Sequence, residues 1–164
     1  MILWKKKNSS IFKSHNEEDT RRLASFLAEL VSGGEVIFLR GPIGAGKTTF
    51  VKGVAEAMGM PASPVSASFS LLKEYRNGNM TMYHIDLFRL KEADMANLGF
   101  EDMLENEKAV IFAEWPDPIA GMLSEDRLEI EFELLKGDER RIKAEAHGAV
   151  SERLLESLKV SFGH

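Results

Sequence analysis

Hydrophobic residues recur at the spacing of one helical face in three stretches of the chain. In the first stretch this spacing is kept by Leu23, Phe26, Leu27, Leu30 and Val31. Ser14 or Asn16 can cap this helix, and Gly33-Gly34 is expected to end it. The second stretch carries Phe50, Val51, Val54, Ala57 and Met58 before Gly59. The third is a short final helix with Ser151 as its expected cap, which carries Leu154, Leu155 and Leu158.

Elsewhere the apolar residues run together or alternate with polar ones, and both patterns predict strands. Residues 35–40 contain an apolar run at 36–39 and are expected to form a buried strand. Residues 109–113 are an unbroken apolar run of the kind that is buried on both faces of a parallel sheet. Residues 71–76 and 80–86 flank Asn77-Gly78, which is a strong hairpin signal.

A second hairpin is expected near the C-terminus. Residues 128–134 and 142–146 alternate apolar and charged positions across Gly137-Asp138. A period of two predicts strands with one buried and one exposed face. Between the hairpins, residues 92–105 are polar and weakly helical. Helices and strands therefore alternate, and the chain is predicted to be an α/β protein with a mixed sheet.

Length and composition limit the possible architectures. The 164 residues, 44% of them hydrophobic, suffice for one compact core but not for two, so residues 1–164 are expected to form a single domain. The longest apolar runs are far shorter than the ~20 residues that cross a bilayer. The first seven residues place their lysines after the apolar residues, the reverse of a secretory signal. We expect a cytoplasmic protein.

The residue types present narrow the chemistry. The chain has no cysteine, which excludes disulfides, thiol nucleophiles and cysteine-bound zinc. Its four histidines are scattered, so any metal is expected to be held by oxygen atoms. The net charge of −5 argues against a large basic surface for binding nucleic acid. We therefore expect any RNA to be held by a partner.

The strongest motif is a glycine-rich loop at residues 41–48, between the first predicted strand and the second helix. Its residues are Gly41, Pro42, Ile43, Gly44, Ala45, Gly46, Lys47 and Thr48, followed by Thr49. The glycines permit close approach of backbone N–H groups to phosphates, the lysine can reach the β- and γ-phosphates, and the Thr48 hydroxyl suits Mg²⁺. The loop predicts an ATP and Mg²⁺ site in a three-layer fold of the P-loop NTPase type, with a mainly parallel central sheet.

Asp86 and Glu114 lie at the ends of predicted strands, where a P-loop fold places its metal ligands. Glu114 follows the run 109–113, and Asp86 ends the strand 80–86, so both are expected near the loop. Either acid can bind Mg²⁺ or orient the attacking water, and we favour metal binding for both. Ser66 and Ser68 can supply a hydroxyl that senses the γ-phosphate. His84 is interpreted as a packed or bridging histidine, and Trp115 as a stacking surface or a rim aromatic.

Four blocks in order resemble the TsaE (YjeE) family of ATPases in bacterial tRNA threonylcarbamoyladenosine biosynthesis. The first is the loop through Thr49, where the family has Gly-Asp-Leu-Gly-Ala-Gly-Lys-Thr-Thr. The others are residues 66–71, like a Ser-Pro-Thr-Phe-x-Leu segment, residues 84–90, like His-x-Asp-Leu-Tyr-Arg-Leu, and Leu98-Gly99 with Glu114-Trp115. The likeness spans most of the chain.

The resemblance implies roles for several residues. Thr48 and Glu114 would bind Mg²⁺, Asp86 would support the metal or hydrolysis, and Ser66 to Ser68 would form a switch-like loop. The segment 16–20, with Glu17 and Thr20, would lie near the adenine. The partner would be the TsaB–TsaD heterodimer, where ATP hydrolysis supports repeated modification of adenosine 37 in tRNAs that read codons starting with A. Contact with tRNA would be indirect.

The chain departs from the family pattern without losing a phosphate or metal ligand. Pro42 and Ile43 replace Asp-Leu, Ala67 replaces proline, Ser68 replaces threonine and Phe88 replaces tyrosine. Loss of the proline frees one backbone angle, so the switch-like loop is expected to be less preorganised than in typical members.

Three other functions compete with a helper ATPase. A small-molecule kinase is the main alternative, although no arginine-rich lid segment is evident. A GTP-driven switch would need an Asn-Lys-x-Asp segment, which the sequence lacks. The third is a nucleotide-binding module without catalysis.

Overall fold

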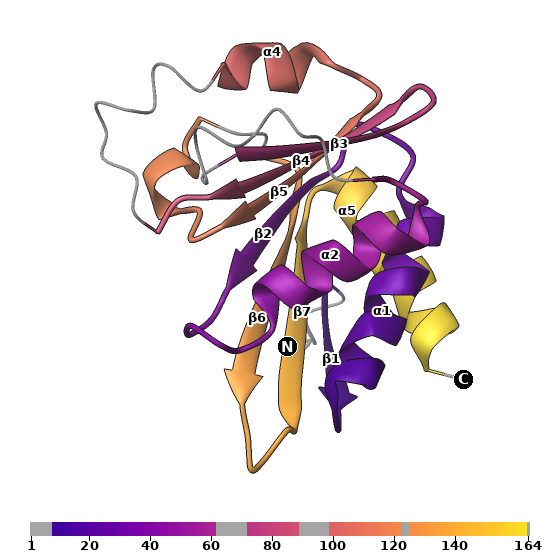
Figure 1. The fold of residues 1–164 in the computed structure, drawn as a ribbon, viewed down its shortest axis with the longest axis vertical. Helices are drawn as coiled ribbons and strands as arrows, with labels where there is room; N and C mark the ends of the chain where they lie inside the picture. The colour runs from indigo at the N-terminus through magenta and orange to yellow at the C-terminus, as the bar shows by residue number, and fades with distance from the viewer. Residues whose placement is uncertain (1–7, 62–71, 89–98, 123–124, 164) are drawn as a thin grey trace, which may run out of the picture.

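The computed structural model describes residues 8–61, 72–88, 99–122 and 125–163. These residues build one seven-stranded sheet in the order β1-β7-β6-β2-β5-β4-β3 (Figure 1). The strands are β1 Ser9–Ser14, β2 Val36–Arg40, β3 Leu72–Asn77, β4 Met80–Asp86, β5 Ala109–Glu114, β6 Arg127–Leu134 and β7 Arg140–His147. The helices are α1 Glu17–Leu30, α2 Lys47–Ala57, α4 Phe100–Glu105, the 3₁₀ turn η2 Asp117–Ile119 and α5 Ala149–Phe162.

The centre of the sheet is parallel and its margins are antiparallel. Strand β2 pairs in parallel with β5 and β6, and β5 pairs in parallel with β4. Both predicted hairpins are present, β3–β4 and β6–β7. All six residues of β5 are buried, as its apolar sequence predicts for a strand inside a parallel sheet. The predicted mixed α/β fold is therefore confirmed.

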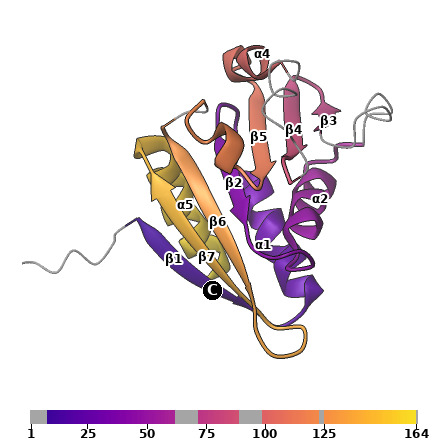
Figure 2. The same cartoon turned by 90° about the vertical axis from the view of Figure 1, so that its left-hand side faces the viewer.

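Two hydrophobic cores lie on opposite faces of the sheet. The larger one packs α1, α2 and α5 against the sheet, and Figure 1 shows α1 between α2 and α5. The smaller one lies under α4 and η2 on the other face (Figure 2). Because strand side chains alternate, Val110 and Phe112 face the larger core whereas Ile111 and Ala113 face the smaller one. Glu114 is thereby directed to the face that α2 covers.

The N-terminal region contains a strand that the sequence did not predict. Strand β1 pairs antiparallel with β7 and closes one edge of the sheet. Ser14 is its last residue, and the cap of α1 is Asn16, whose side chain accepts a hydrogen bond from the Asp19 amide at 2.8 Å. The helix then ends at Leu30, three residues before Gly33.

The prediction for the final helix was wrong in its length and its cap. Helix α5 has 14 residues and begins after Gly148. Ser151 lies inside its first turn, where its amide and hydroxyl both donate to Asp126, at 2.9 and 2.6 Å. Asp126 also accepts from the Val150 amide at 2.8 Å, so a carboxylate distant in sequence takes the capping role.

Two predicted features lie partly or wholly outside the described residues. Ser66 and Ser68 are outside them, as are residues 92–98 of the weakly helical stretch, whereas the rest of that stretch contains α4. Within the described parts of the chain, no helix is both long enough and apolar enough to cross a membrane.

Candidate functional site

The glycine-rich loop joins β2 to α2 at the end of the sheet where the parallel strands terminate. Gly44 and Gly46 adopt φ angles of 82° and 105°, which a residue with a Cβ rarely adopts. Gly46 is the N-cap of α2, and no side chain among residues 8–61, 72–88, 99–122 and 125–163 caps that end. The first amides of α2 therefore lie open to a ligand, which is the arrangement that favours an anion.

Gly41 serves a different purpose from the other two glycines. Its φ is 135°, and a Cβ at this position would lie 2.5 Å from the carbonyl oxygen of Phe132 in β6. The loop therefore leaves β2 in close contact with the neighbouring strand. This contact fixes where the loop begins relative to the sheet.

The Lys47 ammonium is buried beneath the loop. Only 4% of the residue is exposed, and its Nζ donates to the carbonyl oxygens of Gly41 and Pro42. The indole of Trp115 lies over the ammonium, with 4.4 Å between Nζ and the ring centroid. Burial lowers the pKa of Lys47, and the charges of Glu114 and Asp86 act in the opposite direction. A cation held by two neutral carbonyls can exchange them for an anion.

Glu114 connects the loop to the neighbouring strands. Both of its carboxylate oxygens lie 3.1 Å from the Thr48 hydroxyl, which donates to them. Its Oε2 lies 2.5 Å from Nε2 of His84. Burial alone would raise the pKa of Glu114, but hydrogen bonds from His84 and Thr48 and the nearby positive charge lower it below its usual value. The carboxylate is therefore ionised at neutral pH.

Asp86 lies beside Glu114 because β4 and β5 run in parallel register. The two residues are Cα partners across the strands. The Oδ1 atom of Asp86 accepts a hydrogen bond from the Phe88 amide at 3.1 Å, which fixes the turn after β4. Unlike Glu114, Asp86 is only partly buried. Asp86 and Glu114 each end their strand, so the parallel register of β4 and β5 places the two acids side by side.

These residues line one cavity of about 440 Å³, within the range of small-molecule sites. Its lining residues are Ile43, Gly44, Gly46, Lys47, Thr48, Thr49, Asp86, Phe88, Glu114 and Trp115. The rings of Phe88 and Trp115 form part of its wall, with centroids 5.0 Å apart. Trp115 has a φ of 56°, which is unusual for a bulky residue and marks local backbone strain.

A second cavity of about 240 Å³ adjoins the other side of the loop. It shares Gly44, Gly46 and Thr49 with the first cavity. Glu17 and Thr20 of α1 line it, together with Ala45, Asp138 and Arg140. Arg140 donates from Nε to the Ala45 carbonyl oxygen at 3.2 Å and so ties the β6–β7 turn to the loop.

The structure thus brings most of the predicted site residues together. The loop residues, Asp86 and Glu114 border the first cavity, and Glu17 and Thr20 border the second. Ile43 is 72% exposed at the rim. The two serines of the predicted switch-like loop lie outside the described residues. Asp138 and Arg140 were missed, because only the Gly137-Asp138 turn signal was visible and nothing in the sequence links it to the loop.

The described residues do not complete a metal site by themselves. In the described parts of the chain, no group of three or more His, Asp or Glu side chains is arranged to hold a metal ion. Mg²⁺ commonly keeps several waters and binds one or two carboxylates together with phosphate oxygens. The oxygen atoms of Thr48 and Glu114 fit that kind of site and do not form an all-protein cage.

Comparison with known proteins identifies the relatives of this chain. The family model described as threonylcarbamoyl adenosine biosynthesis protein TsaE matches residues 14–142. The tRNA threonylcarbamoyladenosine biosynthesis protein TsaE of Bacillus subtilis (strain 168) is 35% identical over 147 residues, which are 90% of this chain and 92% of that protein. The protein of the same name from Aquifex aeolicus (strain VF5) is 44% identical over 94 residues, which are 56% of this chain and 71% of that protein.

A solved structure has the same fold. The crystal structure of YdiB from Bacillus subtilis aligns with a TM-score of 0.78 and 33% sequence identity, and the alignment covers 93% of this chain and 95% of that one. The similarity therefore extends over nearly the whole length of both chains.

Proposed function

The chain belongs to the TsaE family of threonylcarbamoyl adenosine biosynthesis proteins, and on that premise we propose that it is a Mg²⁺-dependent ATPase that supports tRNA modification. The modification is N6-threonylcarbamoylation of adenosine 37 in tRNAs that read codons starting with A. One observation carries the proposal. The Thr48 hydroxyl meets the Glu114 carboxylate at 3.1 Å in the cavity that also contains Lys47.

The loop has the features that a triphosphate needs. Gly44 and Gly46 have left-handed backbone angles and add no Cβ to the loop, and the start of α2 supplies N–H donors. The Lys47 ammonium exchanges its bonds to Gly41 and Pro42 for bonds to the β- and γ-phosphates. Gly41, Ile43, Ala45 and Thr49 complete the contact with the nucleotide.

Thr48 and Glu114 are the residues that would hold Mg²⁺, with Asp86 beside them. Their oxygen atoms match the preference of this ion, and the ionised state of Glu114 supplies negative charge. When bound, Mg²⁺ would neutralise charge on the phosphate oxygens. With nucleotide bound, Lys47, Asp86 and Glu114 would lie near the γ-phosphate, where water would attack the phosphorus and the bond to the bridging oxygen would break, giving ADP and phosphate.

The second cavity is assigned to the adenosine end of the nucleotide. It adjoins the loop on the side away from Glu114 and is bordered by Glu17 and Thr20. Thr20 is buried, and its Oγ1 lies 2.8 Å from the Ser14 hydroxyl, which fixes this wall. The nucleotide would therefore cross the loop from α1 towards β5.

The proposed partner is the TsaB–TsaD heterodimer, and tRNA contact is indirect. Family membership supports the partner, because the relatives are named for the same pathway. The net charge of −5 supports indirect contact, since a protein that holds tRNA by itself usually presents a basic surface.

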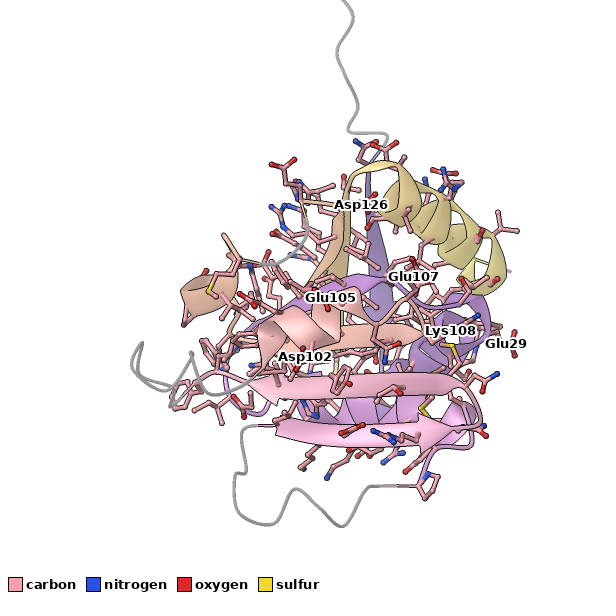
Figure 3. All side chains as sticks on the ribbon, turned by 90° about the horizontal axis from the view of Figure 1, so that it is seen from above. Glu29, Asp102, Glu105, Glu107, Lys108 and Asp126 are labelled. Carbon is pink, nitrogen blue, oxygen red and sulfur yellow. The ribbon has the colours of Figure 1, made fainter. Side chains whose placement is uncertain are left out.

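Calorimetry and turnover assays with a matched pair of lysine variants test this function. Lys47→Ala is expected to weaken ATP binding about tenfold to hundredfold, because charge-assisted hydrogen bonds to phosphate are lost. Lys108→Ala is the control, since Lys108 lies just before β5 at the opposite end of the sheet (Figure 3).

Addition of TsaB–TsaD should change the rate of ATP turnover by the wild-type protein. Rapid phosphate transfer to a small metabolite, with no response to TsaB–TsaD, would instead identify a small-molecule kinase. Equal ATP binding by the two lysine variants would contradict the assigned phosphate site.

A further inference from the structure

His84 lies on β4 and contacts the Glu114 carboxylate at the end of the neighbouring strand β5. Its Nε2 is 2.5 Å from Glu114 Oε2, and both side chains are only 4% exposed. The contact follows from the parallel pairing of β4 with β5, in which His84 is the Cα partner of Phe112, two residues before Glu114. Residues two apart on a strand share a face, so His84 and Glu114 project from the same face of the sheet.

We propose that His84 is a positioning residue, whose Nε2 donates the hydrogen bond that holds the Glu114 carboxylate against Thr48. The role rests on the proposed ATPase function. His84 does not border the cavity described above, whereas Glu114 and Thr48 both do. His84 therefore acts on the reaction only through Glu114.

The surroundings of the imidazole indicate which nitrogen carries the donated proton. Nδ1 of His84 is buried and has no hydrogen-bond partner among the described residues. A proton on Nδ1 would be a buried donor without an acceptor, which is costly. A proton on Nε2 is paired with a carboxylate oxygen. The geometry therefore favours the form with hydrogen on Nε2.

A fixed orientation matters because a glutamate side chain has three rotatable bonds. Thr48 donates a single proton that both oxygens of Glu114 share, so Thr48 alone does not distinguish them. The bond from His84 engages Oε2 and not Oε1, so it distinguishes the two oxygens. Residues that hydrogen-bond to a metal ligand in this way tune its orientation.

Two substitutions of similar size separate positioning from simple packing. The amide nitrogen of glutamine lies near the place of histidine Nε2, whereas that of asparagine lies near the place of Nδ1. His84→Gln therefore keeps a donor directed at Glu114, and His84→Asn does not. The variants His147→Asn and His147→Gln are controls, since His147 lies at the far end of β7, away from the loop.

His84→Asn is expected to lower kcat for ATP hydrolysis by about 10- to 100-fold, the usual cost of losing such a partner. Its ATP affinity, measured by calorimetry, should stay close to that of the wild-type protein. His84→Gln should recover most of the lost turnover, and the His147 variants should lose none. Combined with Glu114→Gln, His84→Asn should add little further loss.

Nucleotide-free protein gives a second readout. Long-range ¹H–¹⁵N spectra of the imidazole should show a proton on Nε2 of His84, and Glu114→Gln should shift that signal. A His84 Nε2 without a proton would overturn the inference. So would equal losses of kcat in folded His84→Gln and His84→Asn, or no loss in His84→Asn. Absence of ATP uptake by the wild-type protein would refute the proposed function, and the spectra would still decide the hydrogen bond.

Discussion

Two carboxylates at opposite ends of the sheet are both hydrogen-bonded, yet their surroundings differ. Glu114 ends β5, and Asp126 lies just before β6, at the end of the sheet that Figure 3 shows. Asp126 accepts from the Val150 and Ser151 amides and the Ser151 hydroxyl. Glu114 accepts from two side chains, His84 and Thr48, and borders a cavity.

The difference separates a carboxylate that stabilises the fold from one that is available for chemistry. The Val150 and Ser151 groups that donate to Asp126 lie in the first turn of α5, and a Cβ at Gly148 would collide with its carboxylate. Asp126 therefore stabilises the start of α5. Glu114 is held by His84 and Thr48, and it also borders the cavity next to the glycine-rich loop. Hydrogen bonding and a lowered pKa are common to both, so the cavity is what distinguishes them.

Removal of the charge at Glu114 should have the largest effect. Glu114→Gln keeps the shape of the side chain but weakens its attraction for Mg²⁺. Turnover of ATP is expected to fall by at least about 100-fold, since loss of a mere partner of a metal ligand already costs 10- to 100-fold. Steady-state kinetics at several Mg²⁺ concentrations measure the effect. Normal hydrolysis by this variant would show that the role assigned to Glu114 is wrong.

Asp126→Ala should affect stability and leave turnover unchanged. Loss of the cap of α5 is expected to reduce the free energy of unfolding by about 1–2 kcal/mol. Urea unfolding followed by circular dichroism measures the change. Glu105→Ala, at the exposed end of α4 in Figure 3, is the control and should change little. A loss of turnover in Asp126→Ala would remove the contrast between the two carboxylates.

The contribution of Asp126 should also depend on pH. Burial acts to raise its pKa, but the hydrogen bonds from Ser151 and Val150 lower it below the usual value of an aspartate. A carboxyl whose pKa is lower in the folded state stabilises the protein above its unfolded pKa, and this stabilisation disappears as pH falls through the folded pKa. The gap in unfolding free energy between wild type and Asp126→Ala should therefore narrow below about pH 4. A gap that widens on acidification would contradict this sign.

The smallest effect is expected at the ion pair between Arg141 and Glu133 on the open face of the β6–β7 hairpin. Its 2.9 Å contact joins side chains that are 49% and 54% exposed. Exposed pairs of this kind contribute about 0–1 kcal/mol. Arg141→Gln should shift the urea midpoint only slightly, and less in high salt than in low salt. A loss as large as that of Asp126→Ala would show that exposure does not govern these energies here.

The sequence predicted the centre of the fold better than its margins. The runs in β2 and β5 and the two hairpins have patterns that depend only on local sequence. Strand β1 was missed because Ile11 and Phe12 are its only apolar residues, and its strand form depends on pairing with β7. The cap of α5 was assigned wrongly because its true partner, Asp126, is 25 residues from Ser151.

In the candidate site, too, the local motifs were predicted from the sequence and the tertiary contacts were not. Residues 41–48 and the positions of Asp86 and Glu114 follow from motif and strand endings. The contact of His84 with Glu114 depends on the register of two strands, and the approach of Arg140 to Ala45 depends on a turn 95 residues away. Such contacts are set by tertiary packing, which a local pattern does not encode.

We propose that the cavity between the glycine-rich loop and Glu114 binds ATP together with Mg²⁺. Isothermal titration of the folded wild-type protein with ATP, in the presence and absence of Mg²⁺, tests this binding. One saturable site is expected, and it should be lost or strongly weakened in Lys47→Ala. Absence of heat from ATP binding under both conditions, with the protein shown to be folded, would contradict it.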